Sequence, residues 1–332
     1  MALKPFARSS KQRLTVGKMA ESSSADNPEE LLGSRNGVSA WAQYLAARAL
    51  LGGVSRLPFC LQRCLINGLA RVARRFDARH SDAARRYLQR ALGCAELERV
   101  RSAGVEARVL QAWRHFLQLS IDAAAFDRRV GEDPLGRVTV ERCEGLDELL
   151  ESGSGGLLIS PHIGDWEAGS AFLSHLGFDP LLAIAKPPRN RPLSRYLQKM
   201  RRKRRVTFLP RRGGIELATE GLRSGSWLLM LLDQRPRKGE VMAPFFGRPA
   251  RTERSAGVLA RRQRLPLVFF HCLKAEEPFH YRLRFTRVVS AAEVRSLTVE
   301  ELATLANEEA EKAILDCPEQ YFWLHDRFRA HP

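Results

Sequence analysis

The two halves of the chain differ in how hydrophobic positions are spaced. In residues 37–150 the apolar residues recur every three or four positions, which places them along one face of a helix. One such stretch carries Leu61, Leu65, Leu69, Val72 and Phe76. We predict that this N-terminal region is helical and includes a later helix from about Leu97 to Phe126.

Arginine residues recur between those apolar positions, at Arg63, Arg71, Arg74 and Arg75. A helix with an apolar stripe and a basic flank is typical of helices that lie in a membrane interface. An ordinary helix that packs its apolar stripe on a protein core has the same spacing. The pattern alone leaves both interpretations open.

From Gly155 onward, short apolar runs alternate with helical stretches. Strands are predicted at Leu157–Ser160, Leu181–Ile184, Val206–Leu209, Trp227–Leu232, Leu267–Phe270 and Tyr281–Phe285. Helices are predicted at Trp166–Leu176, Leu193–Lys203, Ile215–Leu222, Ser255–Arg262 and Leu302–Leu315. Continuous apolar strands that alternate with helices indicate an α/β fold with a largely parallel sheet covered on both faces. The last strand alternates apolar residues with arginine, so we predict that it is an edge strand.

These patterns divide the chain into three parts. Residues 1–36 are polar and rich in serine, which predicts a disordered tail. Residues 37–150 form the helical region, and residues 151–332 form the α/β core that packs with it as one unit. No apolar run approaches the roughly 18 residues of a membrane span, and the six scattered cysteines are expected to be free thiols.

The positive charge is concentrated in one segment. The 332 residues contain 54 Lys+Arg and 37 Asp+Glu, a net charge of +17, and residues 186–212 hold twelve of the basic residues and no acidic ones. Nucleic acid, phosphate groups and an anionic membrane surface are all candidate partners for such a segment. Aromatic side chains that could stack on bases are sparse there, which disfavours nucleic acid.

The strongest candidate for chemistry lies where the first strand of the core ends. The sequence Ser160-Pro-His-Ile-Gly-Asp-Trp-Glu167 places His162 in a loop and Glu167 in the first turn of a helix. Ligands of open α/β sheets bind at this end of the strands. Because the turn folds the two residues toward each other, Glu167 could orient the imidazole of His162, which would then accept a proton from a hydroxyl group. A structural histidine is the alternative.

Other enzyme classes lack their signatures in this chain. We find no GxSxG, HExxH, GxxxxGK[ST] or GxGxxG sequence, which disfavours a serine hydrolase, a zinc protease, an NTPase and a nicotinamide enzyme. Asp233 and Gln234 follow the apolar run that begins at Trp227, so Asp233 could reach a substrate, orient an arginine or cap a loop. The two aromatics of Pro244-Phe-Phe-Gly-Arg-Pro249 could line an acyl pocket or fill a core.

Taken together, these motifs resemble the late acyltransferases of bacterial lipid A biosynthesis, the lauroyl/myristoyl transferase family. The resemblance runs from about Trp41 to Pro332. It is carried by the segment 160–167, Asn190, Leu193, Arg201, Pro210-Arg-Arg-Gly213, Asp233-Gln234, the segment 244–249 and Pro318-Glu-Gln-Tyr-Phe-Trp-Leu-His-Asp-Arg-Phe328. The chain departs from the family at Arg86-Tyr-Leu88, at Ser255 and at His325-Asp-Arg327.

The resemblance implies a glycerolipid-acyltransferase-like fold with N-terminal membrane-associated helices, on the cytoplasmic face of the bacterial inner membrane. It implies that His162 and Glu167 are catalytic, that an acyl thioester of acyl carrier protein is the donor, and that a lipid A precursor is the acceptor. No cofactor or metal is expected. Substrate-binding roles are predicted for Asn190, Arg201, Arg211, Asp233 and Gln234. Acylation of another glycolipid (such as a phosphatidylinositol mannoside) or of a lysophospholipid, a basic nucleic-acid-binding protein and an inactive membrane scaffold are the alternatives.

Overall fold

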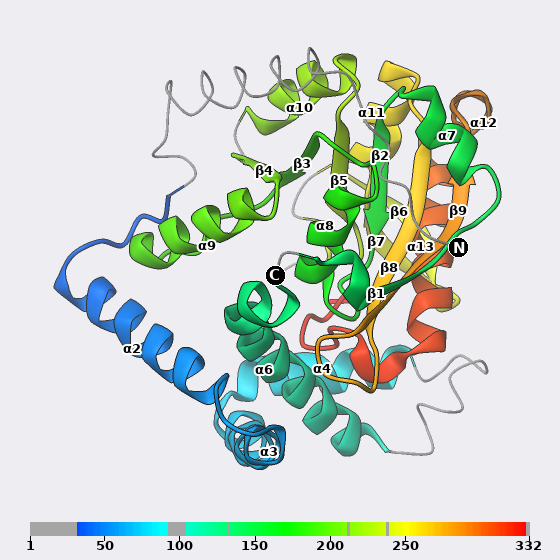
Figure 1. Cartoon of the computed structure of the whole chain (residues 1–332). Helices are drawn as coiled ribbons and strands as arrows, with labels where there is room; N and C mark the ends of the chain where they lie inside the picture. Colours follow the sequence, from blue (N-terminus) through cyan, green and yellow to red (C-terminus); the bar gives the residue numbers. More distant parts are fainter. Residues whose placement is uncertain (1–31, 92–103, 132, 211–212, 237–238, 330–332) are drawn as a thin grey trace.

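A seven-stranded sheet forms the centre of the molecule (Figure 1). The computed structural model describes residues 32–91, 104–131, 133–210, 213–236 and 239–329. The strands of this sheet are β1 (Val138–Glu141), β2 (Gly156–Ser160), β3 (Leu181–Ile184), β4 (Val206–Leu209), β5 (Trp227–Leu231), β8 (Leu267–Lys274) and β9 (Tyr281–Val289). Their order is β1-β9-β8-β2-β5-β3-β4, and every neighbouring pair is parallel except β8 with β9. The predicted largely parallel α/β sheet is therefore confirmed.

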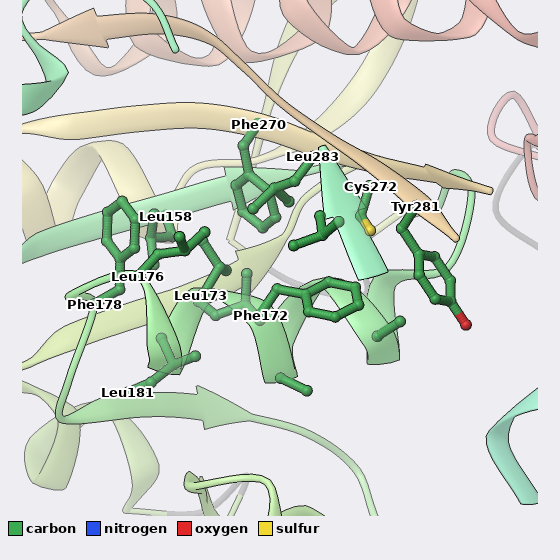
Figure 2. Packing of buried hydrophobic residues seen from close by; sticks show 14 of the residues in the cluster. Leu158, Phe172, Leu173, Leu176, Phe178, Leu181, Phe270, Cys272, Tyr281 and Leu283 are labelled. Atoms are coloured by element: carbon green, nitrogen blue, oxygen red, sulfur yellow. The ribbon is translucent and has the colours of Figure 1, made fainter. Parts of the chain in front are cut away.

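Helices cover both faces of the sheet. The helices of the core are α7 (Leu146–Ser152), α8 (Trp166–His175), α9 (Arg191–Lys203), α10 (Gly214–Arg223), α11 (Ser255–Gln263), α12 (Ala291–Ser296) and α13 (Val299–Asp316). Leu158 of β2 packs under α8, where Figure 2 shows Phe172, Leu173 and Leu176 facing the sheet. Leu157 and Ile159 point to the other face and pack with residues of α10, α11 and α13. Such alternation is the consequence of strand geometry in a sheet buried on both sides.

The N-terminal region supplies four described helices, α2 (Val38–Val54), α3 (Phe59–Phe76), α4 (Ala78–Ala91) and α6 (Val105–Val130). Helix α6 packs against the core, whereas α2 reaches away from the sheet at the lower left of Figure 1 and contacts α6 and α9. In the described parts of the chain, every helix is too short or too polar to cross a bilayer.

The structure corrects two expectations about the edges of the sheet. Strand β1 lies within the region that was predicted to be entirely helical, and it pairs with β9, so β9 is an internal strand. The arginines that suggested an edge instead reach acidic partners, since Arg284 pairs with Glu141 of β1 and with Asp316 of α13. Ion pairs with neighbouring elements therefore account for the alternating pattern.

A two-stranded hairpin, β6 (Glu240–Phe245) with β7 (Arg248–Glu253), lies outside the main sheet and packs on α13. Phe245 and Phe246 are buried in a cluster with Tyr87 of α4 and Trp323. The two phenylalanines therefore fill a core. Residues 1–31 of the expected tail and the expected helix start near Leu97 lie outside the described residues, whereas Arg35 makes two backbone hydrogen bonds with the segment 189–191.

Candidate active site

The ends of strands β2 and β5 bring His162 and Asp233 together. Ser160 and Leu231 are register partners in this parallel pair, and Leu232 N continues the pairing by donating to Ser160 O at 3.3 Å. His162 lies two residues beyond Ser160, and Asp233 lies two residues beyond Leu231. The two side chains thus meet at the carboxyl edge of adjacent strands, where α/β folds place their ligands.

The His162 imidazole and the Asp233 carboxylate form a close pair. His162 Nδ1 is 2.6 Å from Asp233 Oδ1, and the two side chains are 18% and 2% exposed. Burial raises the pKa of Asp233, but the charge and hydrogen bond of His162, with a further contribution from Arg327, outweigh it and leave this pKa below its usual value. When the imidazole carries a single proton on Nδ1, the carboxylate accepts that proton and Nε2 is left as an acceptor. Gln234 Nε2 lies 3.5 Å from that nitrogen.

Glu167 does not pair with His162, which corrects the contact expected from the sequence. It receives two hydrogen bonds from Arg201 of α9, one from Nε at 3.2 Å and one from Nη2. The Arg201 guanidinium also lies over the ring of Phe208, 4.0 Å from its centroid. Helix α8 directs its first turn toward α9, so the carboxylate that contacts His162 comes instead from Asp233, two residues beyond the end of β5.

The loop that carries His162 is fixed on both sides. Gly164 has φ +61°, and a Cβ at this position would lie 1.9 Å from the carbonyl oxygen of Cys272. Its own carbonyl oxygen is 3.1 Å from Nε2 of the buried His115. On the other side, Phe322 N donates to His162 O at 3.0 Å. These contacts hold the imidazole at a fixed height above the strand ends.

Aromatic rings flank the imidazole. The rings of Trp166 and Phe322 lie 5.1 and 6.3 Å from the His162 ring, centroid to centroid. Together with Asp233 they shield much of the imidazole from solvent, while Nε2 remains next to Gln234. The arrangement suits a base that accepts a proton from a hydroxyl group delivered beside Gln234.

The C-terminal segment 318–329 contributes residues to which the sequence reasoning gave no individual role. His325 Nε2 accepts from Arg235 N at 3.2 Å, and burial is the main reason why the pKa of His325 is lowered. Arg327 is 1% exposed and donates to the carbonyl oxygen of Leu232, which is the residue before Asp233. The motif 318–328 carries part of the resemblance, but nothing in it predicts a contact with Leu232, the residue that follows strand β5.

Asn190 and Arg211 were both predicted to bind substrate, and the structure describes only Asn190. Asn190 is the N-cap of α9, where its Oδ1 accepts from Leu193 N at 3.0 Å and its Nδ2 donates to Ala40 O at 2.8 Å. Its amide is therefore occupied by contacts that tie α9 to α2. Arg211 lies outside the described residues.

The basic segment 186–212 is divided between internal pairs and an exposed face. Arg204 is buried and donates to Asp127 of α6 at 2.8 Å, and Arg205 pairs with Asp179 at 2.7 Å. With Arg201, these residues serve to join elements of the fold. The exposed basic residues of α9 are Arg195, Lys199, Arg202 and Lys203.

The family model and the curated relatives that match this chain all concern lipid A biosynthesis. A family model described as bacterial lipid A biosynthesis acyltransferase matches residues 34–330. The lipid A biosynthesis palmitoleoyltransferase of Escherichia coli (strain K12) is 27% identical over 196 residues, which cover 57% of this chain and 61% of that protein. The lipid A biosynthesis acyltransferase of Shigella flexneri is similar to the same extent. The match thus spans about 61% of the length of these curated relatives.

Proposed function

The chain belongs to the bacterial lipid A biosynthesis acyltransferase family, and on this basis we propose that it transfers a fatty acyl chain from an acyl thioester to a hydroxyl group of a lipid A precursor. The observation that supports this proposal most directly is the contact between His162 and Asp233 at the ends of β2 and β5. A buried carboxylate that holds Nδ1–H leaves Nε2 as a general base for a hydroxyl nucleophile.

In the proposed reaction, His162 Nε2 takes the proton of the acceptor hydroxyl, which we assign to the 3-hydroxyl of a lipid A acyl chain. The oxygen then forms a bond to the thioester carbonyl carbon. When the tetrahedral intermediate collapses, the carbon–sulfur bond breaks and the thiolate leaves. The imidazolium, stabilised by Asp233, returns its proton to the sulfur, so no proton or electron is left over.

Glu167 has a different part in this proposal from the one that the sequence indicated. It fixes the Arg201 guanidinium through two parallel hydrogen bonds. Arg201 Nη1 makes no hydrogen bond to any of the described residues, so it is available to an oxygen of a phosphorylated acceptor. Arginine is well suited to this because its donors are held in a rigid plane. We therefore assign Glu167 the positioning of Arg201, and Arg201 the binding of phosphate.

The donor is proposed to be acyl carrier protein, whose acidic surface would be attracted to the basic face of α9. Arg195, Lys199, Arg202 and Lys203 are exposed there. Helix α9 also carries Arg201, so a carrier bound along this face would present its thioester near the catalytic pair. Opposite charges of this kind increase the rate of association and depend on salt.

Helix α3 supports a location on an anionic membrane surface. Its apolar stripe is solvent-exposed instead of packed on the core: Leu61, Leu65, Leu69, Val72 and Phe76 are 43–80% exposed. The buried side of the same helix consists of Gln62, Ile66 and Ala70. An exposed apolar stripe beside arginines is the pattern of a helix that lies in a bilayer interface. We propose that α3 docks on the cytoplasmic face of the inner membrane.

The proposed activity is tested with the full chain, acyl carrier protein charged with a fatty acid and a lipid A precursor in mixed micelles, with products identified by mass spectrometry. We expect one acyl chain to be added to the precursor by the wild type and none by a folded His162→Ala variant. Acyl coenzyme A, a phosphatidylinositol mannoside and a lysophospholipid serve as alternative substrates. Acylation of one of these but not of the lipid A precursor would replace the proposed acceptor, and turnover by His162→Ala would exclude the mechanism.

A further inference from the structure

Arg327 is a fully buried cation next to the end of β5, where Leu232 and Asp233 follow the strand. It is 1% exposed, and its guanidinium lies over the ring of Phe245 at 4.9 Å from the centroid. Nη1 donates to Leu232 O at 3.0 Å. Nη2 donates to Thr252 Oγ1 at 3.0 Å and to Asn307 Oδ1 at 2.7 Å.

None of these acceptors is a carboxylate, which is unusual for a buried arginine. A charge removed from water is strongly destabilising unless an opposite charge lies near it. The positive charge of Arg327 helps to keep the pKa of the equally buried Asp233 below its ordinary value, against the effect of burial. Because Leu232, which Arg327 binds, immediately precedes Asp233, the cation is anchored to the backbone that positions this anion.

We propose that Arg327 is a positioning residue of the acyl-transfer site, which keeps Asp233 ionised beside a neutral His162 and fixes the end of β5 through Leu232 O. The inference rests on the proposed function, because it concerns the state of the site before proton transfer. A general base must be neutral before it accepts a proton, so His162 cannot then supply the positive charge that a buried Asp233 requires. Arg327 supplies that charge without a hydrogen bond to Asp233, and the carboxylate therefore remains free to hold His162 Nδ1.

The other charged and titratable groups around the pair do not fill this role. Tyr321 and Tyr87 are buried and hydrogen-bonded to each other at 2.9 Å, and burial raises the pKa of both, so they stay neutral. His325 has a lowered pKa, chiefly through burial, and is neutral at physiological pH. Asp326 is an anion paired with Arg86.

The buried His271 lines the same small cavity as Asp233, and burial lowers its pKa to about 4, so it is neutral at physiological pH. Three more charged groups lie nearby. Glu309 of α13 lines the same small cavity as Asp233 and pairs with Lys312. Arg201 is engaged with Glu167, and Arg235 donates its backbone N–H to His325 and a side-chain N–H to Arg329 O. Among the described residues, Arg327 is thus the buried cation that remains available to balance the charge of Asp233.

The test compares Arg327→Gln and Arg327→Lys with Thr252→Val, which removes one partner of Arg327 but keeps its charge. Loss of a nearby positive charge makes protonation of His162 and Asp233 easier. In Arg327→Gln we therefore expect the acid limb of kcat/KM to move to higher pH by about half a unit or more. In Arg327→Lys and Thr252→Val, the acid limb of kcat/KM should lie at the same pH as in the wild type. The proposal would be overturned if Arg327→Gln reduced kcat/KM equally at every pH and left the acid limb in place. Arg327 would then have a purely structural role.

A second measurement separates this inference from the proposed activity. Histidine ring NMR on the full chain, with the His162 signal identified by its absence in His162→Ala, gives the midpoint of the His162 titration without any turnover. We expect this midpoint to rise in Arg327→Gln and to stay unchanged in Thr252→Val, whatever substrate the protein uses. An unchanged midpoint in Arg327→Gln overturns the inference. If Arg327→Gln fails to fold, Arg327→Met, which also removes the charge, decides by the same criterion: a raised midpoint supports the role of the charge, and an unchanged midpoint contradicts it.

Discussion

His162 and Asp233 come within 2.6 Å of each other because the strands that precede them are adjacent and in register. They are separated by 71 positions in the sequence. Glu167, only five residues from His162, is directed to Arg201 instead. Strand order therefore determines which carboxylate accompanies the imidazole.

Replacement of Asp233 by Asn should reduce kcat by on the order of 10²- to 10⁴-fold, because an amide no longer stabilises the imidazolium and can favour the wrong tautomer. Single-turnover acyl transfer measures this loss. Circular dichroism controls for folding, since the carboxylate is buried. Activity within about twofold of the wild type in Asp233→Asn would remove Asp233 from the mechanism.

Replacement of Glu167 by Gln should mainly raise KM for the phosphorylated acceptor, by about tenfold, because Arg201 is no longer held in a planar ion pair. The matched control is Asp179→Asn, which breaks the comparable ion pair with Arg205 and should leave KM unchanged. Steady-state kinetics with a phosphorylated acceptor and with one that lacks phosphate would measure this change, and KM should rise only for the phosphorylated acceptor. A loss of kcat with unchanged KM would instead return Glu167 to a direct catalytic role.

Replacement of Leu65 by Glu on α3 should weaken binding to vesicles that contain anionic phospholipids by about tenfold, because an apolar side chain no longer enters the interface. Met242→Glu is the control, since Met242 is 58% exposed but lies on β6. Vesicle sedimentation measures binding. If the stripe of α3 joins two copies of the chain, Leu65→Glu would change the mass in analytical ultracentrifugation and leave vesicle binding intact.

Replacement of Gly164 by Ala should destabilise the fold by about 3 kcal/mol or more, because the new Cβ meets the Cys272 carbonyl and the backbone has positive φ. Gly153→Ala is a matched control, since Gly153 also has positive φ but has open space around it. Gly153→Ala should lower the free energy of unfolding by about 1 kcal/mol. Urea unfolding of the two variants would measure the difference, and equal losses would show that close packing at Gly164 is unimportant.

The buried His115 should make the fold sensitive to acid. Burial is the main reason why its pKa is lowered to about 3, with Lys274 as a further cause. The unfolded chain binds a proton at this residue below about pH 6.5, whereas the folded chain does not until about pH 3. Its contribution to stability is therefore complete above pH 6.5 and falls by about 1.4 kcal/mol for each unit of pH below it.

This effect is isolated by comparison with His115→Gln, because Asp165 acts in the opposite direction. Burial raises the pKa of Asp165 to about 6, so folding takes up a proton there as the pH falls. We expect the stability difference between the wild type and His115→Gln, measured by urea unfolding, to shrink between pH 6.5 and 4. A difference that is constant with pH would mean that His115 is protonated in the fold.

Much of the fold follows from the sequence because the buried strands are continuous apolar runs. The predicted strands β3 and β4 coincide with those in the structure, and β2 and β5 differ by one residue at one end. Strand β1 was missed because Val138–Glu141 is short and half exposed, without the run of apolar residues that marks a central strand. The hairpin β6–β7 was missed because prolines and arginines interrupt its pattern.

The candidate site was only half predictable for a related reason. His162 and Asp233 were each placed at the end of a strand, which local sequence can show. Their contact depends on β5 lying beside β2 while β3, the next strand in the chain, lies outside β5. Local patterns carry no signal for this order, so proximity in sequence favoured Glu167. The contact between Arg327 and Leu232 likewise depends on packing between distant segments.

The hydrogen bond from Phe322 to His162 has a consequence for biogenesis. The ribosome makes the His162 loop long before it makes Phe322 and Arg327, which complete the surroundings of the His162–Asp233 pair. A nascent chain that has emerged only as far as β9 therefore contains His162 and Asp233 but lacks the segment that contacts them. The geometry of the candidate site is therefore completed only late in translation, after the segment that contains Phe322 and Arg327 has been made.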